Sequence, residues 1–180
     1  MDPFAILGLP RRPLLTEEEI GSSYRKLAGS LHPDQTEGDT VAFRNLGEAV
    51  AILRDPARRL RELAGTGSSN NLPPQAAEYF HRVAELLQRT DTLLEKCSMA
   101  SNALAKALLV SPLKTVTTDL KSLLAVIRTW RSVLDQELSL IDQRWPEHDS
   151  TTLLLLADSF AYAGRWENQL RQRELALDCL

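Results

Sequence analysis

Residues 24–36 read YRKLAGSLHPDQT and residues 43–59 read FRNLGEAVAILRDPARR, and these two stretches decide the fold of the N-terminal part of the chain. Before the first proline, apolar residues recur at spacings of four, three and four, which places on one helix face Ile20, Tyr24, Leu27 and Leu31. Pro33 disfavours helical geometry at His32, so we expect this helix to end near Leu31. The second stretch carries a similar apolar face, formed by Leu46, Ala49, Val50 and Leu53. The pattern predicts two amphipathic helices joined by a loop that begins at His32-Pro33-Asp34.

Short signals on either side extend this prediction. Thr16 and Glu19 have the spacing of a capping box, which opens the first of the two helices. Asp55-Pro56 interrupts the chain after the second helix and starts a short basic helix, ARRLREL. Upstream, an apolar segment over residues 4–9 ends at Gly8 and Pro10.

Residues 65–74, GTGSSNNLPP, form a seam of glycine, small polar residues and a proline pair, which is typical of a domain boundary. Beyond it the periodicity predicts three longer helices, at about 75–110, 113–144 and 150–176. Pro112 and Pro146 mark the predicted breaks, although residues 97–102 are an alternative break inside the first helix. The predicted fold is therefore all-α, with an N-terminal helical hairpin domain over 1–64, a linker over 65–74 and a three-helix bundle over 75–180.

Composition excludes several classes of function. The chain has a net charge of −3, whereas nucleic-acid-binding surfaces carry an excess of basic residues, so we expect no nucleic-acid partner. Cys97 and Cys179 form no CxxC pair, and the three histidines belong to no metal-binding or nucleophile pattern, so we expect neither a cofactor nor an enzyme. No apolar run is long enough to span a membrane and the N-terminus has no basic leader, which predicts a cytoplasmic protein that does not engage a membrane.

The hairpin with its central tripeptide closely resembles the J domain. Matching positions flank the tripeptide on both sides, namely Tyr24, Leu27, Ala28, Phe43, Leu46, Glu48, Ala49, Leu53 and the Asp55-Pro56 turn with Arg58-Arg59. The resemblance implies that His32, Pro33 and Asp34 contact a DnaK-type chaperone ATPase and favour its hydrolysis-competent state. It also places Arg25 and Lys26 at positions that meet acidic chaperone surface, although exposed basic residues on a helix are often only solvated.

The opening FAILGLP resembles the start of HscB-type proteins, with Phe4, Gly8, Leu9 and Pro10 at the matching positions. That resemblance implies an HscA-type chaperone partner, and a C-terminal domain that binds an IscU-like iron-sulfur cluster scaffold. The best candidate for the scaffold-binding stripe is formed by Tyr79, Phe80, Val83, Leu86 and Leu87, with Phe160 or Tyr162 as a possible helper. The same stripe at helical spacing is also typical of a bundle core.

Three interpretations of the function remain open at this stage. The favoured one is a co-chaperone that delivers the scaffold to its chaperone and so assists iron-sulfur cluster assembly. The second is a J-domain adaptor for an unrelated client, which is favoured if the helix beginning near Gln75 buries its apolar stripe completely. The third is a J-like interaction protein that does not stimulate a chaperone.

Overall fold

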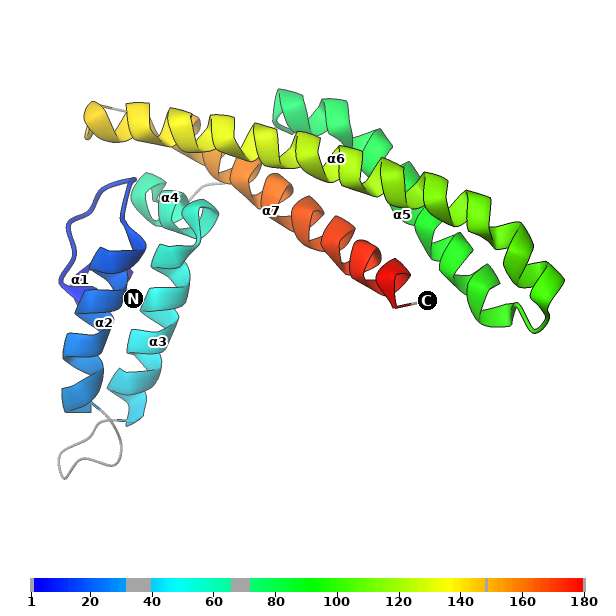
Figure 1. Ribbon diagram of the computed structural model, residues 1–180. Coiled ribbons are helices and arrows are strands. Elements are labelled where there is room, and N and C mark those ends of the chain that lie inside the picture. The colour runs from blue at the N-terminus through cyan, green and yellow to red at the C-terminus, as the bar shows by residue number, and fades with distance from the viewer. Residues whose placement is uncertain (1, 32–39, 66–71, 148, 180) are drawn as a thin grey trace. The chain divides into compact units, whose positions relative to one another are not determined.

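The computed structural model describes residues 2–31, 40–65, 72–147 and 149–179, and every regular element in these ranges is a helix (Figure 1). The helices are α1 (Pro3–Leu7), α2 (Glu17–Leu31), α3 (Thr40–Arg54), α4 (Pro56–Ala64), α5 (Pro74–Met99), α6 (Ala103–Gln143) and α7 (Ser150–Asp178). The prediction of an all-α fold is confirmed.

The backbone divides into two compact units, each made of two separate stretches of sequence. Unit 1 combines residues 1–71 with 135–160, and unit 2 combines residues 72–134 with 161–180. Helices α6 and α7 therefore each contribute to both units. The grouping of 135–160 with the N-terminal helices differs from the predicted division, whose boundaries at 64 and 75 stay a prediction.

In unit 1, the first two helices begin at side-chain caps. Asp2 accepts a hydrogen bond from the backbone N–H of Phe4 at 3.0 Å, and Pro3 supplies the preset backbone angle of a first helical position. Helix α1 ends at Gly8, whose φ of +62° lies in the left-handed region that glycine adopts without strain.

The capping box at the start of α2 is formed as predicted. The N–H of Glu19 donates to Thr16 Oγ1 at 3.2 Å, and the N–H of Thr16 donates to Glu19 Oε2 at 2.7 Å. The second bond holds the pKa of Glu19 below its usual value, helped by the Thr16 hydroxyl and by Arg12. Helix α2 runs to Leu31, the predicted end.

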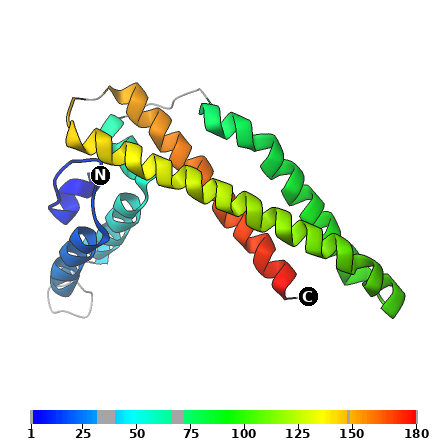
Figure 2. The same ribbon diagram turned by 45° about the horizontal axis from the view of Figure 1, so that its top comes forward.

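Helices α2 and α3 lie side by side and antiparallel, as both ribbon views show (Figures 1 and 2). Their shared core is closed by α1 and consists of Phe4, Leu7, Leu15, Ile20, Leu46, Ala49, Val50 and Leu53. Of the predicted apolar face of α2, Ile20 is fully buried, whereas Tyr24, Leu27 and Leu31 are half-buried at the rim of this core. Helix α3 thus contributes four of the eight buried residues of this core, whereas α2 contributes only Ile20.

Asp55 turns the chain from α3 into α4 as the sequence predicted. Its carboxylate accepts the N–H of Ala57 at 2.9 Å, and Pro56 occupies the first helical position. Because α4 begins directly after α3, its buried side chains Ala57 and Leu60 are brought to the base of the hairpin.

In unit 2, the predicted break at Pro112 is wrong, because this residue lies inside α6. The break falls at residues 100–102, within the alternative segment, where the Asn102 side chain accepts the N–H of Ala105 at 2.8 Å and caps the new helix. A proline in a helix interior removes one backbone hydrogen bond and costs roughly 3 kcal/mol, which a helix of 41 residues can absorb. Figure 2 shows α5 and the beginning of α6 converging on the short connection between them.

Unit 2 is held together by aromatic packing and ion pairs between its helices. Trp130 of α6 packs on Trp166 of α7 with ring centroids 6.1 Å apart, and Tyr79 of α5 meets Trp130 edge-on at 5.8 Å. Arg173 donates two hydrogen bonds of 3.1 Å to the Asp91 carboxylate, which joins α7 to α5.

Candidate functional site

The tripeptide His32-Pro33-Asp34 lies outside the described residues, which resume at Thr40. The structure therefore describes the two helices that lead into and out of this loop. Helix α2 ends at Leu31 and α3 begins at Thr40, so both ends of the loop belong to one packed hairpin. The described part of the site therefore consists of the surface of α2 and the contacts that hold the hairpin together.

Arg25 and Lys26 are exposed on α2, on the side away from the buried Ile20. Neither forms an ion pair with another described residue, so both cations are available to a partner. Ser22 and Gly29 are also exposed, which leaves a continuous polar surface along this helix. A surface of this kind guides encounter and register with an acidic partner more than it adds affinity.

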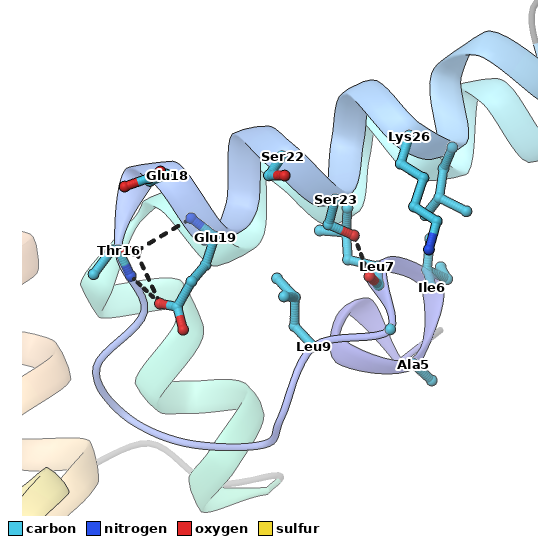
Figure 3. Close-up of a pocket in the computed structure, with 12 residues that line it drawn as sticks. Ala5, Ile6, Leu7, Leu9, Thr16, Glu18, Glu19, Ser22, Ser23 and Lys26 are labelled. Atoms are coloured by element: carbon cyan, nitrogen blue, oxygen red, sulfur yellow. Dashed lines mark hydrogen bonds between the residues drawn. The ribbon is translucent and has the colours of Figure 1, made fainter.

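A groove of about 690 Å³ runs between α1 and α2, next to this basic surface. Glu18 and Glu19 line one end, Lys26 lines the other, and Ile6 and Leu9 form the apolar wall (Figure 3). The Ser23 hydroxyl donates a hydrogen bond to the carbonyl oxygen of Leu7, which fixes α1 against α2. Figure 3 shows the Lys26 side chain extending from α2 towards Ile6.

Arg59 is buried at the base of the hairpin, with only 3% of its surface exposed. Its Nε donates to the carbonyl oxygen of Pro13 at 2.7 Å, and its Nη1 donates to the carbonyl oxygen of Leu53. Burial lowers the pKa of this guanidinium, and the charges of Asp55 and Asp142 oppose that shift. One side chain on α4 thus ties together the connection before α2 and the end of α3.

Two further polar contacts join the N-terminal helices of unit 1 to its second stretch. The N–H of Leu14 donates to Asp142 Oδ1 at 3.0 Å, and Arg61 pairs with Asp158 at 2.7 Å. These contacts could not be predicted from the sequence, because Asp142 and Asp158 lie on helices that the sequence assigned to the other domain.

The predicted scaffold-binding stripe separates into two groups. Val83 and Leu86 are buried in the core of unit 2, which removes them from any client-binding surface. Phe80 is 53% exposed, with its ring centroid 6.4 Å from that of Trp166, while Tyr79 and Leu87 are half-buried. The reason is helical geometry: 83, 86, 90 and 93 form the inward row of α5, and Phe80 lies beside that row.

The two candidate helper aromatics are not equivalent. Phe160 is buried and belongs to unit 1, whereas Tyr162 is half-buried in unit 2 with its ring centroid 5.3 Å from that of Trp166. Tyr162 is thus in the same aromatic cluster as Phe80, and Phe160 is core.

Sequence comparison identifies the N-terminal part of the chain. Residues 2–61 match the DnaJ domain family. These residues are a J domain. No solved structure matches the chain.

Similar proteins align over less than half of this chain. The Chaperone protein DnaJ of Hyphomonas neptunium is 48% identical over 61 residues, which cover 32% of this chain and 15% of that protein. The Chaperone protein DnaJ of Deinococcus proteolyticus is 38% identical over 76 residues, which cover 41% of this chain and 24% of that protein. Protein SIS1 of Saccharomyces cerevisiae is 45% identical over 47 residues, which cover 26% of this chain and 13% of that protein. The matched stretches therefore cover less than a quarter of the length of these relatives.

The described ranges contain neither a metal-binding cluster nor a membrane-spanning helix. Among the described residues, no group of three or more His, Cys, Asp or Glu side chains could hold a metal ion. No helix in those ranges is long and apolar enough to cross a membrane.

The buried Arg59 yields a stability prediction with a matched control. Arg59→Met keeps the length and apolar stem of the side chain but leaves the carbonyl groups of Pro13 and Leu53 without their donor. We expect the free energy of unfolding to fall by about 3 kcal/mol, since each unsatisfied buried acceptor is costly. Arg58→Met, at the exposed neighbouring position, should change it by less than about 0.5 kcal/mol. Urea denaturation followed by circular dichroism measures both, and equal effects of the two substitutions would contradict the role assigned to Arg59.

Proposed function

We propose that this protein is a co-chaperone that stimulates ATP hydrolysis by a DnaK-type chaperone. The observation that carries the proposal is the J domain at residues 2–61, with an intact His32-Pro33-Asp34 tripeptide between its two long helices. The exposed Arg25 and Lys26 on α2, which pair with no other described residue, support it, because they offer positive charge on the helix that leads into the tripeptide. In this proposal the catalytic groups belong to the partner, and this chain is not itself an enzyme.

We further propose that the client is an IscU-like iron-sulfur cluster scaffold and that the chaperone is of the HscA type. Two features support this narrower assignment. The opening Phe4-Ala5-Ile6-Leu7-Gly8-Leu9-Pro10 has the HscB-type pattern, and its residues form α1 and the turn at Gly8. The chain beyond the J domain is helical in all its described elements, as the client-binding domain of such a protein is. Any cluster would be carried by the scaffold, so no cofactor of this chain is needed.

A second candidate function is a J-domain adaptor for an unrelated client. The burial of Val83 and Leu86 favours it, because the HscB-type assignment had placed both residues in the scaffold-binding stripe. The two proposals share the chaperone partner and differ only in what the second unit binds. They can therefore be tested separately.

Chaperone stimulation is tested by replacing the tripeptide histidine. In single-turnover measurements with a DnaK-type chaperone, His32→Gln should abolish the acceleration of ATP hydrolysis. In this proposal the His32 imidazole contacts the chaperone, and glutamine cannot reproduce that contact. The control is His81→Gln, at an exposed position of α5, which should stimulate as the unchanged protein does. Helical content by circular dichroism should be the same in all three proteins. Full stimulation by His32→Gln would sink the co-chaperone proposal.

Scaffold binding is tested at the exposed member of the predicted stripe. Calorimetric titration of the intact protein with an IscU-like scaffold should show weaker binding for Phe80→Ala by at least about tenfold, since an exposed aromatic anchor commonly dominates a protein interface. Val133→Ala, also partly exposed in unit 2, serves as the control and should bind as the unchanged protein does. Absence of binding by the unchanged protein, with chaperone stimulation intact, would reject the iron-sulfur client and leave the general adaptor.

A further inference from the structure

The end of the α5–α6 hairpin exposes large apolar side chains, and we call residues 96–114 the hairpin tip. Met99 is 79% exposed, Leu104 is 71%, Leu108 is 69% and Val110 is 63%. Each of these fractions exceeds that of Phe80, the exposed member of the predicted client stripe. The largest concentration of exposed apolar side chains in the described part of the chain therefore lies at a place that the sequence analysis had not singled out.

The sequence of the tip makes this exposure unusual for a helix. Residues 103–110 read ALAKALLV, so the first two turns of α6 carry a single polar side chain, Lys106. A helix that is apolar on all sides is normally buried, and contiguous exposed apolar surface commonly marks an interaction site. We infer that another surface covers these turns when the protein works.

The charge of the tip indicates what kind of surface that is. Between Glu95 and Asp119 the chain has three lysines, Lys96, Lys106 and Lys114, and no acidic residue, although the whole chain has a net charge of −3. None of the three lysines forms an ion pair with another described residue. A partner that brings carboxylates next to apolar side chains would complement this surface, and a basic partner would be repelled.

A groove beside the tip adds a concave element. It has a volume of about 560 Å³ and lies between α5 and α6, with Leu93, Pro112 and Val116 among its apolar lining residues. Its only charged lining residues are the cations Arg89 and Lys96. Arg89 is partly neutralised by Asp119 at 3.3 Å, so Lys96 is the uncompensated charge at this groove.

We propose that the hairpin tip and its groove bind an acidic, apolar segment of a client protein. Apolar side chains of the segment enter the groove and cover Leu104 and Leu108, while its carboxylates lie near Lys96 and Lys106. The groove distinguishes such a segment from an anionic membrane, because a bilayer surface can cover a protruding tip but cannot fill a concavity between two helices. Only the description of the occupant as a client rests on the proposed co-chaperone function, since the binding itself requires no chaperone.

The test begins with a random-peptide library displayed on phage and selected on the immobilised full chain. The most enriched peptide is then synthesised with a fluorescent label, and its affinity is measured by anisotropy. We expect the enriched peptides to combine Asp or Glu with large apolar residues, and their binding to weaken as salt is raised. No enrichment, or enrichment of peptides without acidic residues, would overturn the proposal.

Matched variants locate the binding site. Leu108→Ser and Lys96→Glu should each weaken peptide binding by about tenfold or more, as expected at the centre of an interface. The controls are Leu175→Ser, at a position of α7 that is 64% exposed, and Lys121→Glu on a later turn of α6, and both should bind as the unchanged protein does. Equal weakening in variants and controls would place the peptide elsewhere. All four positions are at the surface, and unchanged thermal unfolding midpoints verify that the fold is intact.

Two further measurements separate the alternatives. Cosedimentation with phosphatidylglycerol vesicles, lost in Leu108→Ser while no peptide is selected, would assign the tip to an anionic membrane and overturn the protein-segment proposal. Stimulation of a DnaK-type ATPase should be retained in Leu108→Ser, because the substitution lies outside the J domain. If the unchanged protein does not stimulate the ATPase, the co-chaperone function is rejected, and peptide binding by the hairpin tip stands as an independent result.

Discussion

The arrangement of the J domain depends on one buried cation, Arg59. Its guanidinium satisfies two backbone carbonyl groups, those of Pro13 and Leu53, which belong to segments far apart in the sequence. Removing a charged group from water is costly, and the cost is offset here by these hydrogen bonds and by the nearby charges of Asp55 and Asp142. Because each donor has a fixed direction, Arg59 sets where α4 lies against the end of α3 and the connection before α2. The base of the hairpin is thereby fixed, and the described ends of the two helices, Leu31 and Thr40, lie at the opposite end of the hairpin.

In the proposed function the catalytic groups belong to the chaperone, and this chain contributes surfaces that bind it. The apolar core between α1, α2 and α3 gives α2 one buried side, so the other side with Arg25 and Lys26 remains at the surface. Unit 2 offers a second positively charged surface at the hairpin tip, where lysines accompany exposed leucines. Each surface combines charge with a rigid helical support. Such surfaces suit the recruitment of two acidic partners, a chaperone and a client.

Much of the first unit could be predicted from the sequence because its signals are local. The capping box of Thr16 and Glu19 and the Asp55-Pro56 turn each specify hydrogen bonds within a few residues, and the apolar spacing of α2 specifies its buried side. The partners of Arg59 could not be predicted, because every residue has a backbone carbonyl and the residue types do not show which carbonyl accepts a hydrogen bond. The grouping of residues 135–160 with the N-terminal helices could not be predicted for a related reason, since contacts such as that of Leu14 with Asp142 join distant segments.

In the second unit, the apolar periodicity predicted the helices. It did not predict all of the helix ends, or how far neighbouring helices bury each apolar face. The break at residues 100–102 follows from the Asn102 cap, whereas Pro112 is accommodated within α6. Likewise, the apolar stripe of α5 was recognised, but only the packing of neighbouring helices decides that Val83 is buried and Phe80 is exposed. A pattern in one helix shows which side is apolar, and the partner helix determines how much of that side is covered.

The central claim is that this J domain engages a DnaK-type chaperone through α2 and the loop that follows it. The most direct measurement is an NMR titration of the isotope-labelled full chain with an unlabelled DnaK-type chaperone in its ATP-bound state. We expect the amide signals of Ser22, Arg25, Lys26 and the non-proline residues of 32–39 to shift or broaden first, whereas signals from the buried face of α3 should broaden only through the slower tumbling of the complex. Signal changes confined to α5 and α7, with those of α2 unaffected, would contradict the central claim.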